Sequence, residues 1–283
     1  MIGRYRITDQ LLDEFRRRLG TEEKSELTIA QYMRDVRDFC GFLQKGEPVD
    51  KEEAIAYKDH LVKTYRSSAT VNTKLAALNK FFAATGMDAC RVKLLRRQRR
   101  MFCETDRELT REEYLRLLET AQKSNKPRLS LIMQTICSTG IRVSEVKYIT
   151  VEAAHAGRAE ISLKGKLRVI LLPGKLCRKL KKYARAQKTA SGEIFLTRSG
   201  KSLSRKQIWA EMKRLCRKAG VAPSKVFPHN LRHLFARTFY RVCRDIVKLA
   251  DVLGHSSVET TRIYLISTGA EHARILKKMN LVI

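Results

Sequence analysis

Apolar residues recur at helical spacing through most of this chain, and only one segment follows the spacing of strands. Between residues 25 and 46 they lie three and four positions apart and stop at Gly46, as in an amphipathic helix. Residues 158–173 instead alternate apolar and polar side chains around Gly165, which predicts an antiparallel β-hairpin. A third short strand could follow at residues 192–200. We therefore expect a mainly α fold with a small antiparallel β-sheet.

Helix signals and changes of composition divide the chain into two expected domains joined by a linker. Residues 1–90 hold four short amphipathic helices, residues 91–106 form a basic linker, and residues 107–283 form a mostly helical domain that contains the hairpin. Three of the expected helices begin with a capping pair: Asp50 with Glu53, Thr110 with Glu113, and Ser204 with Gln207. The length of the chain suits two ordinary domains.

The charge of the chain predicts a polyanionic partner. Lys and Arg outnumber Asp and Glu by 58 to 29, which gives a formal net charge of +29. Such an excess repels itself in a folded protein unless a polyanion neutralises it, and nucleic acid is the expected one. A membrane surface is the competing polyanion, but the sequence has no apolar run near about 18 residues and no lipidation signal.

The cysteines and the first residues of the sequence predict a cytoplasmic protein. Seven cysteines are scattered along the chain without CxxC spacing. An odd number at such spacing favours reduced thiols and argues against a disulfide framework or a zinc site. The opening residues also lack the apolar stretch of a secretory signal.

The linker and one helix contain candidate DNA contacts. Six basic residues fall within ten positions without an acid: Arg91, Lys93, Arg96, Arg97, Arg99 and Arg100. This run is either a solvated linker or a strap along a phosphate backbone, and its charge density favours the strap. Polar residues on one N-terminal helix are candidates for base contacts: Asn72, Lys74 and Asn79.

A short run near residue 230 places two histidines and an arginine on one helical face. His229, Arg232 and His233 lie at positions i, i+3 and i+4, directly after Pro228. The two histidines have the spacing of metal ligands, but no carboxylate or thiol cluster completes a site, so no metal is expected. The alternative of core histidines is weakened by Arg232, because a guanidinium on that face needs an anion.

A second arginine and a tyrosine extend this set toward phosphate chemistry. Arg142 lies in an apolar segment, and Glu145 one turn later can orient it while its other donors face a phosphate. Two arginines can hold the non-bridging oxygens of a phosphodiester and stabilise a pentacovalent transition state without a metal. Tyr264 can supply the oxygen nucleophile, although an isolated tyrosine is more often a packing residue.

The ordered set resembles the signature of the tyrosine recombinases of the phage integrase type. The matching pieces are R142-V-S-E145, Lys164 followed by Gly in the hairpin, H229-N-L-R232-H233, L-G-H255-S-S, and Tyr264. Their order and spacing agree with the family across the whole second domain. The four-helix N-terminal part is similar to the SAM-like core-binding domain of that family.

The resemblance implies a role for each matching residue. Tyr264 would attack the scissile phosphate, Arg142 and Arg232 would bind its oxygens, and no cofactor would be needed. The remaining implied roles are these: Lys164 as general acid, His229 as general base or acid, His255 as a phosphate ligand, Glu145 as a support for Arg142, and His233 as a brace behind its helix. The hairpin is one residue shorter than the family pattern, so Lys166 remains the alternative general acid.

The resemblance also implies how such an enzyme would work. It would be a simple Xer-like or transposon-integrase-like member without an arm-binding domain, associated with the bacterial nucleoid. It would bind double-stranded core recombination sites as a homotetramer and pass through a Holliday junction. The amphipathic tail at residues 269–283 would dock on a neighbouring subunit or pack on its own domain. The rival classes are a DNA-binding protein of this fold without catalysis and a type IB topoisomerase; target site and accessory factors are not readable from the sequence.

Overall fold

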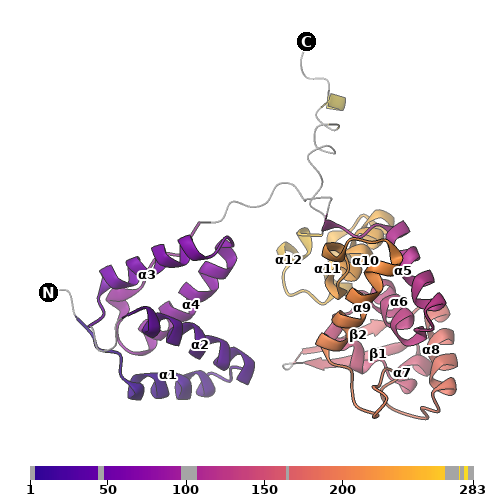
Figure 1. Ribbon diagram of the computed structural model, residues 1–283, viewed down its shortest axis with the longest axis horizontal. Coiled ribbons are helices and arrows are strands. Elements are labelled where there is room, and N and C mark those ends of the chain that lie inside the picture. Colours follow the sequence, from indigo (N-terminus) through magenta and orange to yellow (C-terminus); the bar gives the residue numbers. More distant parts are fainter. Residues whose placement is uncertain are drawn as a thin grey trace. The chain divides into compact units, whose positions relative to one another are not determined.

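The computed structural model describes residues 4–43, 48–96, 107–163, 166–264, 274 and 277–279, with Leu163 and Lys166 described in the backbone only. The chain divides into two units, Met1–Arg99 and Arg100–Ile283 (Figure 1). Helices dominate both units, and the sheet in the second unit has two antiparallel strands. This confirms the mainly α fold with a small antiparallel sheet.

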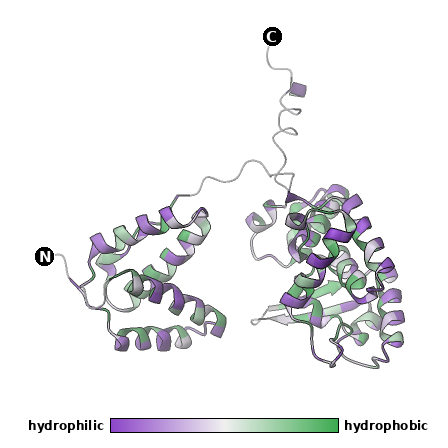
Figure 2. Ribbon diagram, in the orientation of Figure 1, coloured by the Kyte–Doolittle hydropathy of each residue, from purple (hydrophilic) through white to green (hydrophobic). Residues whose placement is uncertain are grey.

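The first unit is a bundle of four helices followed by a single 3-10 turn. Its elements are α1 (Asp9–Thr21), α2 (Glu26–Phe42), α3 (Lys51–Thr64), α4 (Ser68–Ala84) and η1 (Asp88–Cys90). Asp50 caps α3 as expected, since its carboxylate accepts from the backbone N–H groups of Glu52 and Glu53. The apolar faces of the helices turn inward (Figure 2), and Phe81 of α4 packs edge-on against Phe15 of α1.

The second unit is mostly helical, and its hairpin has one buried and one exposed face. Its elements are α5 (Arg111–Lys123), α6 (Pro127–Thr139), η3 (Val143–Tyr148), α7 (Val151–Ala156), β1 (Arg158–Leu163), β2 (Lys166–Leu171), α8 (Gly174–Ala186), α9 (Arg205–Ala219), η4 (Pro223–Lys225), α10 (Pro228–Cys243), α11 (Ile246–Leu253) and α12 (Val258–Arg262). The capping boxes at the start of α5 and α9 are both formed as predicted. In the described part of the chain, no helix is long and apolar enough to span a membrane.

The hairpin forms where the alternating pattern predicts it. β1 pairs with β2 in antiparallel register from Arg158 opposite Leu171 to Leu163 opposite Lys166. Ala159, Ile161 and Ile170 are buried on one face, while Leu167 is exposed on the other. The sheet therefore sends alternate residues of β2 into the unit.

One expectation for the secondary structure of this unit is wrong. Residues 192–200 form no strand; they make two isolated bridges, Thr150 with Glu193 and Leu196 with Ser202. Neighbouring Ile194 and Phe195 are both buried, so the segment does not alternate as a strand with one exposed face does. The chain changes conformation at the end of α6. Gly140 ends that helix in the left-handed conformation, and the 3-10 helix η3 follows.

Candidate active site

Four parts of the second unit bring the predicted residues together. Arg142 is the N-cap residue of η3, Arg232 lies on α10, His255 follows the end of α11, and Tyr264 follows α12. α10 packs against both α6 and α11 and thereby carries Arg232 to the ends of these helices. Residues more than one hundred positions apart in the sequence thus share one site.

Arg232 is the centre of this arrangement. Its side chain is among the largest that are fully buried in the described structure, with 2% of the residue exposed. Nη1 donates to the carbonyl oxygen of Gly140, and Nη2 donates to that of Leu253 at 2.8 Å. The ends of α6 and α11 therefore fix the plane of the guanidinium, while Nε remains directed at the side chain of Tyr264.

Tyr264 is packed with its hydroxyl against that arginine. The residue is 3% exposed, and its oxygen accepts from Nε of Arg232 at 3.4 Å. Its ring stacks on His255 at a centroid distance of 5.8 Å and meets the edge of His233 at 4.5 Å. The residue also belongs to a small hydrophobic cluster with Ala236, Leu249 and Leu253, so Tyr264 combines a packing position with polar contacts to its hydroxyl and ring.

The contacts of His255 determine which of its nitrogens carries the proton. Nε2 lies 2.9 Å from Nη2 of Arg232, and a guanidinium can only donate, so Nε2 accepts. The proton is then on Nδ1, which donates to Oγ1 of the buried Thr261 at 2.8 Å. Burial, together with the charges of Arg232 and Arg142, lowers the pKa of His255 to about 4. The ring is neutral at neutral pH.

His229 and His233 share the face of α10 that looks toward Tyr264. Their ring centroids are 4.7 Å apart, and the ring of His229 is 6.0 Å from that of Tyr264. Burial lowers both pKa values, with a further effect of Arg232 on His229, and the pKa of His233 falls to about 4. The expectation that His233 braces the helix from behind is wrong, because its i, i+4 relation to His229 puts both rings on the site face.

Arg142 is oriented by Glu145 as predicted. The Glu145 carboxylate accepts from Nη1 of Arg142 at 2.9 Å and from its backbone N–H at 2.8 Å. Glu145 is buried, whereas Arg142 is exposed; Nη2 of Arg142 makes one long bond, at 3.5 Å, to the carbonyl oxygen of Gly254. This geometry suits an arginine that binds an anion at the surface of the site.

Arg168 of β2 also belongs to this group, and the sequence analysis assigned it no role. Its Nη1 donates to both carboxylate oxygens of Glu145, at 3.3 and 3.2 Å, and its Nη2 donates to the carbonyl oxygen of Val252 at 2.6 Å. The available signal was its position: Arg168 alternates with the exposed Leu167 and so falls on the inward face with Ile170.

The structure describes little of the two candidates for the general acid. Lys164 lies outside the described residues, and Lys166 is described only as the first backbone position of β2. Both remain predictions. Among the residues that the structure describes, no group of three or more His, Cys, Asp or Glu side chains is arranged to hold a metal ion.

The basic linker is described as far as Arg96. Arg91, Lys93 and Arg96 are exposed, and Arg91 forms an ion pair with Asp88 at 3.2 Å. Arg97, Arg99 and Arg100 lie outside the described residues. A strap along DNA therefore remains a prediction. The same holds for the tail at residues 269–283, of which only position 274 and residues 277–279 are described, all of them helical.

The side chains of Asn72 and Asn79 form hydrogen bonds to the backbone of the linker segment. The Asn72 side chain donates to the carbonyl oxygen of Leu95 and accepts from its N–H, at 3.0 and 2.8 Å. Asn79 makes the same pair of bonds with Val92, both at 2.8 Å. The two asparagines lie two helical turns apart on α4 and fasten the extended segment to it. The prediction of base contacts through these amides is corrected accordingly.

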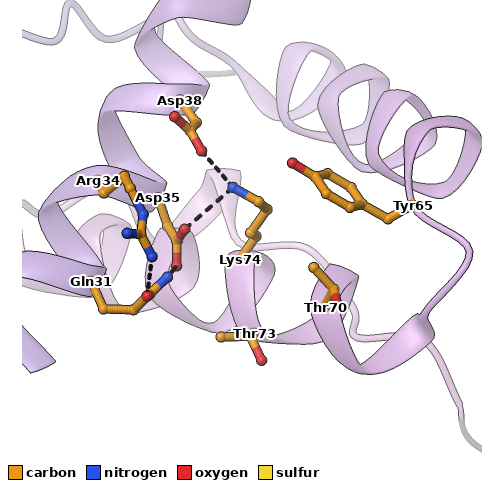
Figure 3. Close-up of a pocket in the computed structure, with 8 residues that line it drawn as sticks. All are labelled: Gln31, Arg34, Asp35, Asp38, Tyr65, Thr70, Thr73 and Lys74. Carbon is orange, nitrogen blue, oxygen red and sulfur yellow. Dashed lines mark hydrogen bonds and ion pairs between the residues drawn. The ribbon is translucent and has the colours of Figure 1, made fainter. Parts of the chain in front are cut away.

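Lys74 is also internal. It bridges Asp35 and Asp38 of α2, and its ammonium lies 5.6 Å from the centre of the Tyr65 ring (Figure 3). Burial opposes its charge, but the hydrogen bonds to Asp38 and Asp35 raise its pKa above the ordinary value. Lys74 therefore joins two helices, and the prediction that it reads bases is corrected for the same reason as for Asn72.

Comparison with known proteins agrees with this arrangement. Residues 107–271 match the model of the phage integrase family, and residues 12–85 match its N-terminal SAM-like domain. The tyrosine recombinase XerA of Pyrococcus furiosus is 30% identical over 98% of this chain and 96% of its own length. A crystal structure of XerA recombinase superposes over 98% of this chain and all of its own chain, with 23% identity and a TM-score of 0.52. A lambda integrase dimer bound to a COC' core site gives 0.71 at 18% identity, over 92% and 77% of the two chains.

Fold, site and relatives together define an enzyme of the tyrosine recombinase class, which cleaves and rejoins DNA strands. The chain belongs to the phage integrase family.

Proposed function

We propose that this chain is a site-specific DNA recombinase in which Tyr264 attacks the scissile phosphate. The observation that carries the proposal is the position of the Tyr264 hydroxyl, 3.4 Å from Nε of the buried Arg232 in the same chain. A nucleophile and a phosphate-binding guanidinium are thus adjacent within one subunit. Attack gives a 3′-phosphotyrosine and a free 5′-hydroxyl without a metal or ATP.

The charges around the hydroxyl support an anionic substrate. The cations placed to face the substrate are Arg142 and Arg232, while the nearby carboxylate of Glu145 is shared by Arg142 and Arg168. A phosphodiester that gains negative charge in its transition state is stabilised by such donors. Arg142 and Arg232 are the proposed ligands of its non-bridging oxygens. His255 is the proposed further phosphate contact; because its Nδ1 proton is donated to Thr261 in this structure, it would need a proton on Nε2 to donate to the phosphate.

The proton transfers can be assigned to named groups. As the bond between the Tyr264 oxygen and phosphorus forms, the hydroxyl proton passes to His229, whose lowered pKa leaves it neutral and able to accept. As the bond from phosphorus to the 5′-oxygen breaks, that oxygen takes a proton from Lys164, with Lys166 as the alternative. The reverse reaction with a 5′-hydroxyl from another strand rejoins the DNA.

The assembly is proposed from the relatives. A lambda integrase tetramer bound to a Holliday junction has the same fold, with 19% identity and a TM-score of 0.71. We expect this chain to act likewise as a homotetramer on two duplexes, with the tail at residues 269–283 docked on the neighbouring subunit. Residues 1–90 would serve as the core-binding domain, residues 91–106 as the linker along DNA, and residues 107–283 as the catalytic domain.

A trapping experiment tests the proposal. A duplex selected from a random pool by binding to the protein is nicked near the cleavage position, so that the released fragment diffuses away and the covalent complex accumulates. Wild-type protein should give a covalent protein–DNA band on a denaturing gel, and Tyr264→Phe should bind equally well but give none. Binding without a covalent band from the wild type would support a DNA-binding protein that lacks catalysis.

A plasmid relaxation assay distinguishes recombination from the second alternative, which is type IB topoisomerase activity. A type IB topoisomerase shares the covalent chemistry but works with little sequence preference. Relaxation of plasmids without the selected site, in the absence of recombinant products, would favour that activity over recombination.

A further inference from the structure

The guanidinium of Arg168 joins the hairpin to the rest of the candidate site. One nitrogen bonds to the Glu145 carboxylate and another to the carbonyl oxygen of Val252, near the end of α11. Arg168 itself belongs to β2, which begins at Lys166. Three elements that are separate in the sequence therefore meet at one side chain.

At the end of the hairpin where β2 begins, the described side chains on the outward face of the sheet are exposed. Leu167 is 73% exposed, and its cross-strand partner Ser162 is also exposed. The next pair is Arg168 with Ile161, and both side chains lie on the inward face. Among the described side chains of the two strands, this pair is the inward-facing one nearest the turn. Tyr148 holds β1 by donating to the carbonyl oxygen of Ser162, so Arg168 is the corresponding contact of β2.

The position of Arg168 places constraints on the surrounding chain and on the guanidinium itself. A Cβ on Gly254 would lie 2.7 Å from Nε of Arg168, so this position, which also has a φ of +63°, requires glycine. Burial lowers the pKa of Arg168 to about 10, partly offset by Glu145, and Nε is buried with no hydrogen-bond partner in the described structure. Since a buried ion pair of this kind adds little to stability, its position calls for another explanation.

We propose that Arg168 is a positioning residue: by fixing β2 it sets the position of the lysine, on or next to this strand, that protonates the leaving 5′-oxygen. The inference rests on the proposed recombinase function. Arg142 has its own two bonds to Glu145, and Arg232 is held by the carbonyl oxygens of Gly140 and Leu253, so neither phosphate-binding arginine bonds to Arg168. Loss of Arg168 should therefore impair leaving-group protonation selectively.

The test compares two leaving groups in single-turnover cleavage by the full-length protein. One nicked suicide duplex carries the normal 5′-oxygen, and the other carries a 5′-bridging phosphorothiolate, whose sulfur leaves without an acid. Because general acid catalysis typically contributes at least about 100-fold, Arg168→Met should lose about 100-fold on oxygen and less than about fivefold on sulfur. Arg168→Lys can reach one partner of the guanidinium, not both, and should recover part of the loss on oxygen.

The matched control is Arg158→Met, which removes an exposed arginine from the same sheet. It should cleave both substrates as the wild type does. An equal loss on both substrates in Arg168→Met, or no loss on either, would overturn the inference. If Arg168→Met does not fold, the comparison is made with Arg168→Lys, which keeps the charge, and the same two results decide. Failure of the wild type to form a covalent complex on either duplex would instead refute the proposed function.

Discussion

Gly140→Ala should destabilise the second unit and disturb Arg232 at the same time. Gly140 ends α6 with a φ of +66°, and its carbonyl oxygen accepts from Arg232. A Cβ at this position would lie 2.6 Å from Cε1 of Phe235 and 3.0 Å from Cδ2 of Leu253. An alanine therefore meets both an unfavourable backbone conformation and a filled space.

The free-energy cost of the backbone conformation can be separated from the cost of overpacking. A side chain in the left-handed region costs about 1–2 kcal/mol, and overpacking of a filled interior costs about 1–3 kcal/mol more. Gly157→Ala provides the control, because Gly157 ends α7 with a φ of +72° and a Cβ there would have no neighbour within 4 Å. Gly157→Ala should carry only the backbone cost, so the difference between the variants isolates the contact with Phe235, about 1–3 kcal/mol.

Urea unfolding followed by tryptophan fluorescence measures both variants. The chain has 1 Trp, Trp209 on α9, so the signal reports on the second unit alone. Gly140→Ala should show the lower midpoint and also a reduced yield of covalent complex under conditions where it remains folded. Equal midpoints for Gly140→Ala and Gly157→Ala would refute the close packing of Phe235 against the end of α6.

Three further predictions concern the bundle, the histidines and the DNA contacts. Lys74→Met should destabilise the first unit by about 3 kcal/mol, because Asp35 loses a buried partner. The backbone amides of α4 should then exchange hydrogen faster. The double variant that also carries Asp35→Leu should recover protection from exchange. The folded pKa values of His233 and His255, about 4, lie below the ordinary 6.5, so the unfolded chain binds more protons and stability should fall as pH drops from about 6.5 to about 4; a urea midpoint of the Trp209 signal that stays flat over this range would contradict it. DNA affinity should fall by several orders of magnitude between low and moderate salt if on the order of ten phosphates are neutralised, and a shallow salt dependence would argue against so many contacts.

The helix boundaries could be predicted because their signals are local. Asp50, Thr110 and Ser204 each bond to backbone groups within three residues, so the sequence contains the whole interaction. The hairpin could be predicted for the same reason, because its alternating pattern and its turn lie within sixteen residues of sequence. By contrast, residues 192–200 resemble a strand in composition, but adjacent side chains are buried and the backbone pairs only through two isolated bridges.

The polar side chains were assigned wrongly where their partners are distant in the sequence. Asn72 and Asn79 look like solvent-facing residues of an amphipathic helix, yet both are used by a segment 13 and 23 residues further on. Lys74 pairs with an aspartate 39 residues earlier. Helical periodicity indicates which face is apolar, but it contains no information on which polar residue will meet another element.

Most of the candidate site could nevertheless be named from the sequence, because chemistry constrains it more tightly than packing does. A guanidinium buried as deeply as Arg232 must find acceptors, and in the structure they are two helix-end carbonyls, a neutral imidazole and a tyrosine oxygen. None of these partners carries a full negative charge at neutral pH, and the nearby Glu145 is shared by Arg142 and Arg168. The site therefore concentrates positive charge beyond what its own acids offset, at a cost to the isolated fold. Such an arrangement is explained by an anion that binds beside Tyr264, and a phosphodiester meets that requirement.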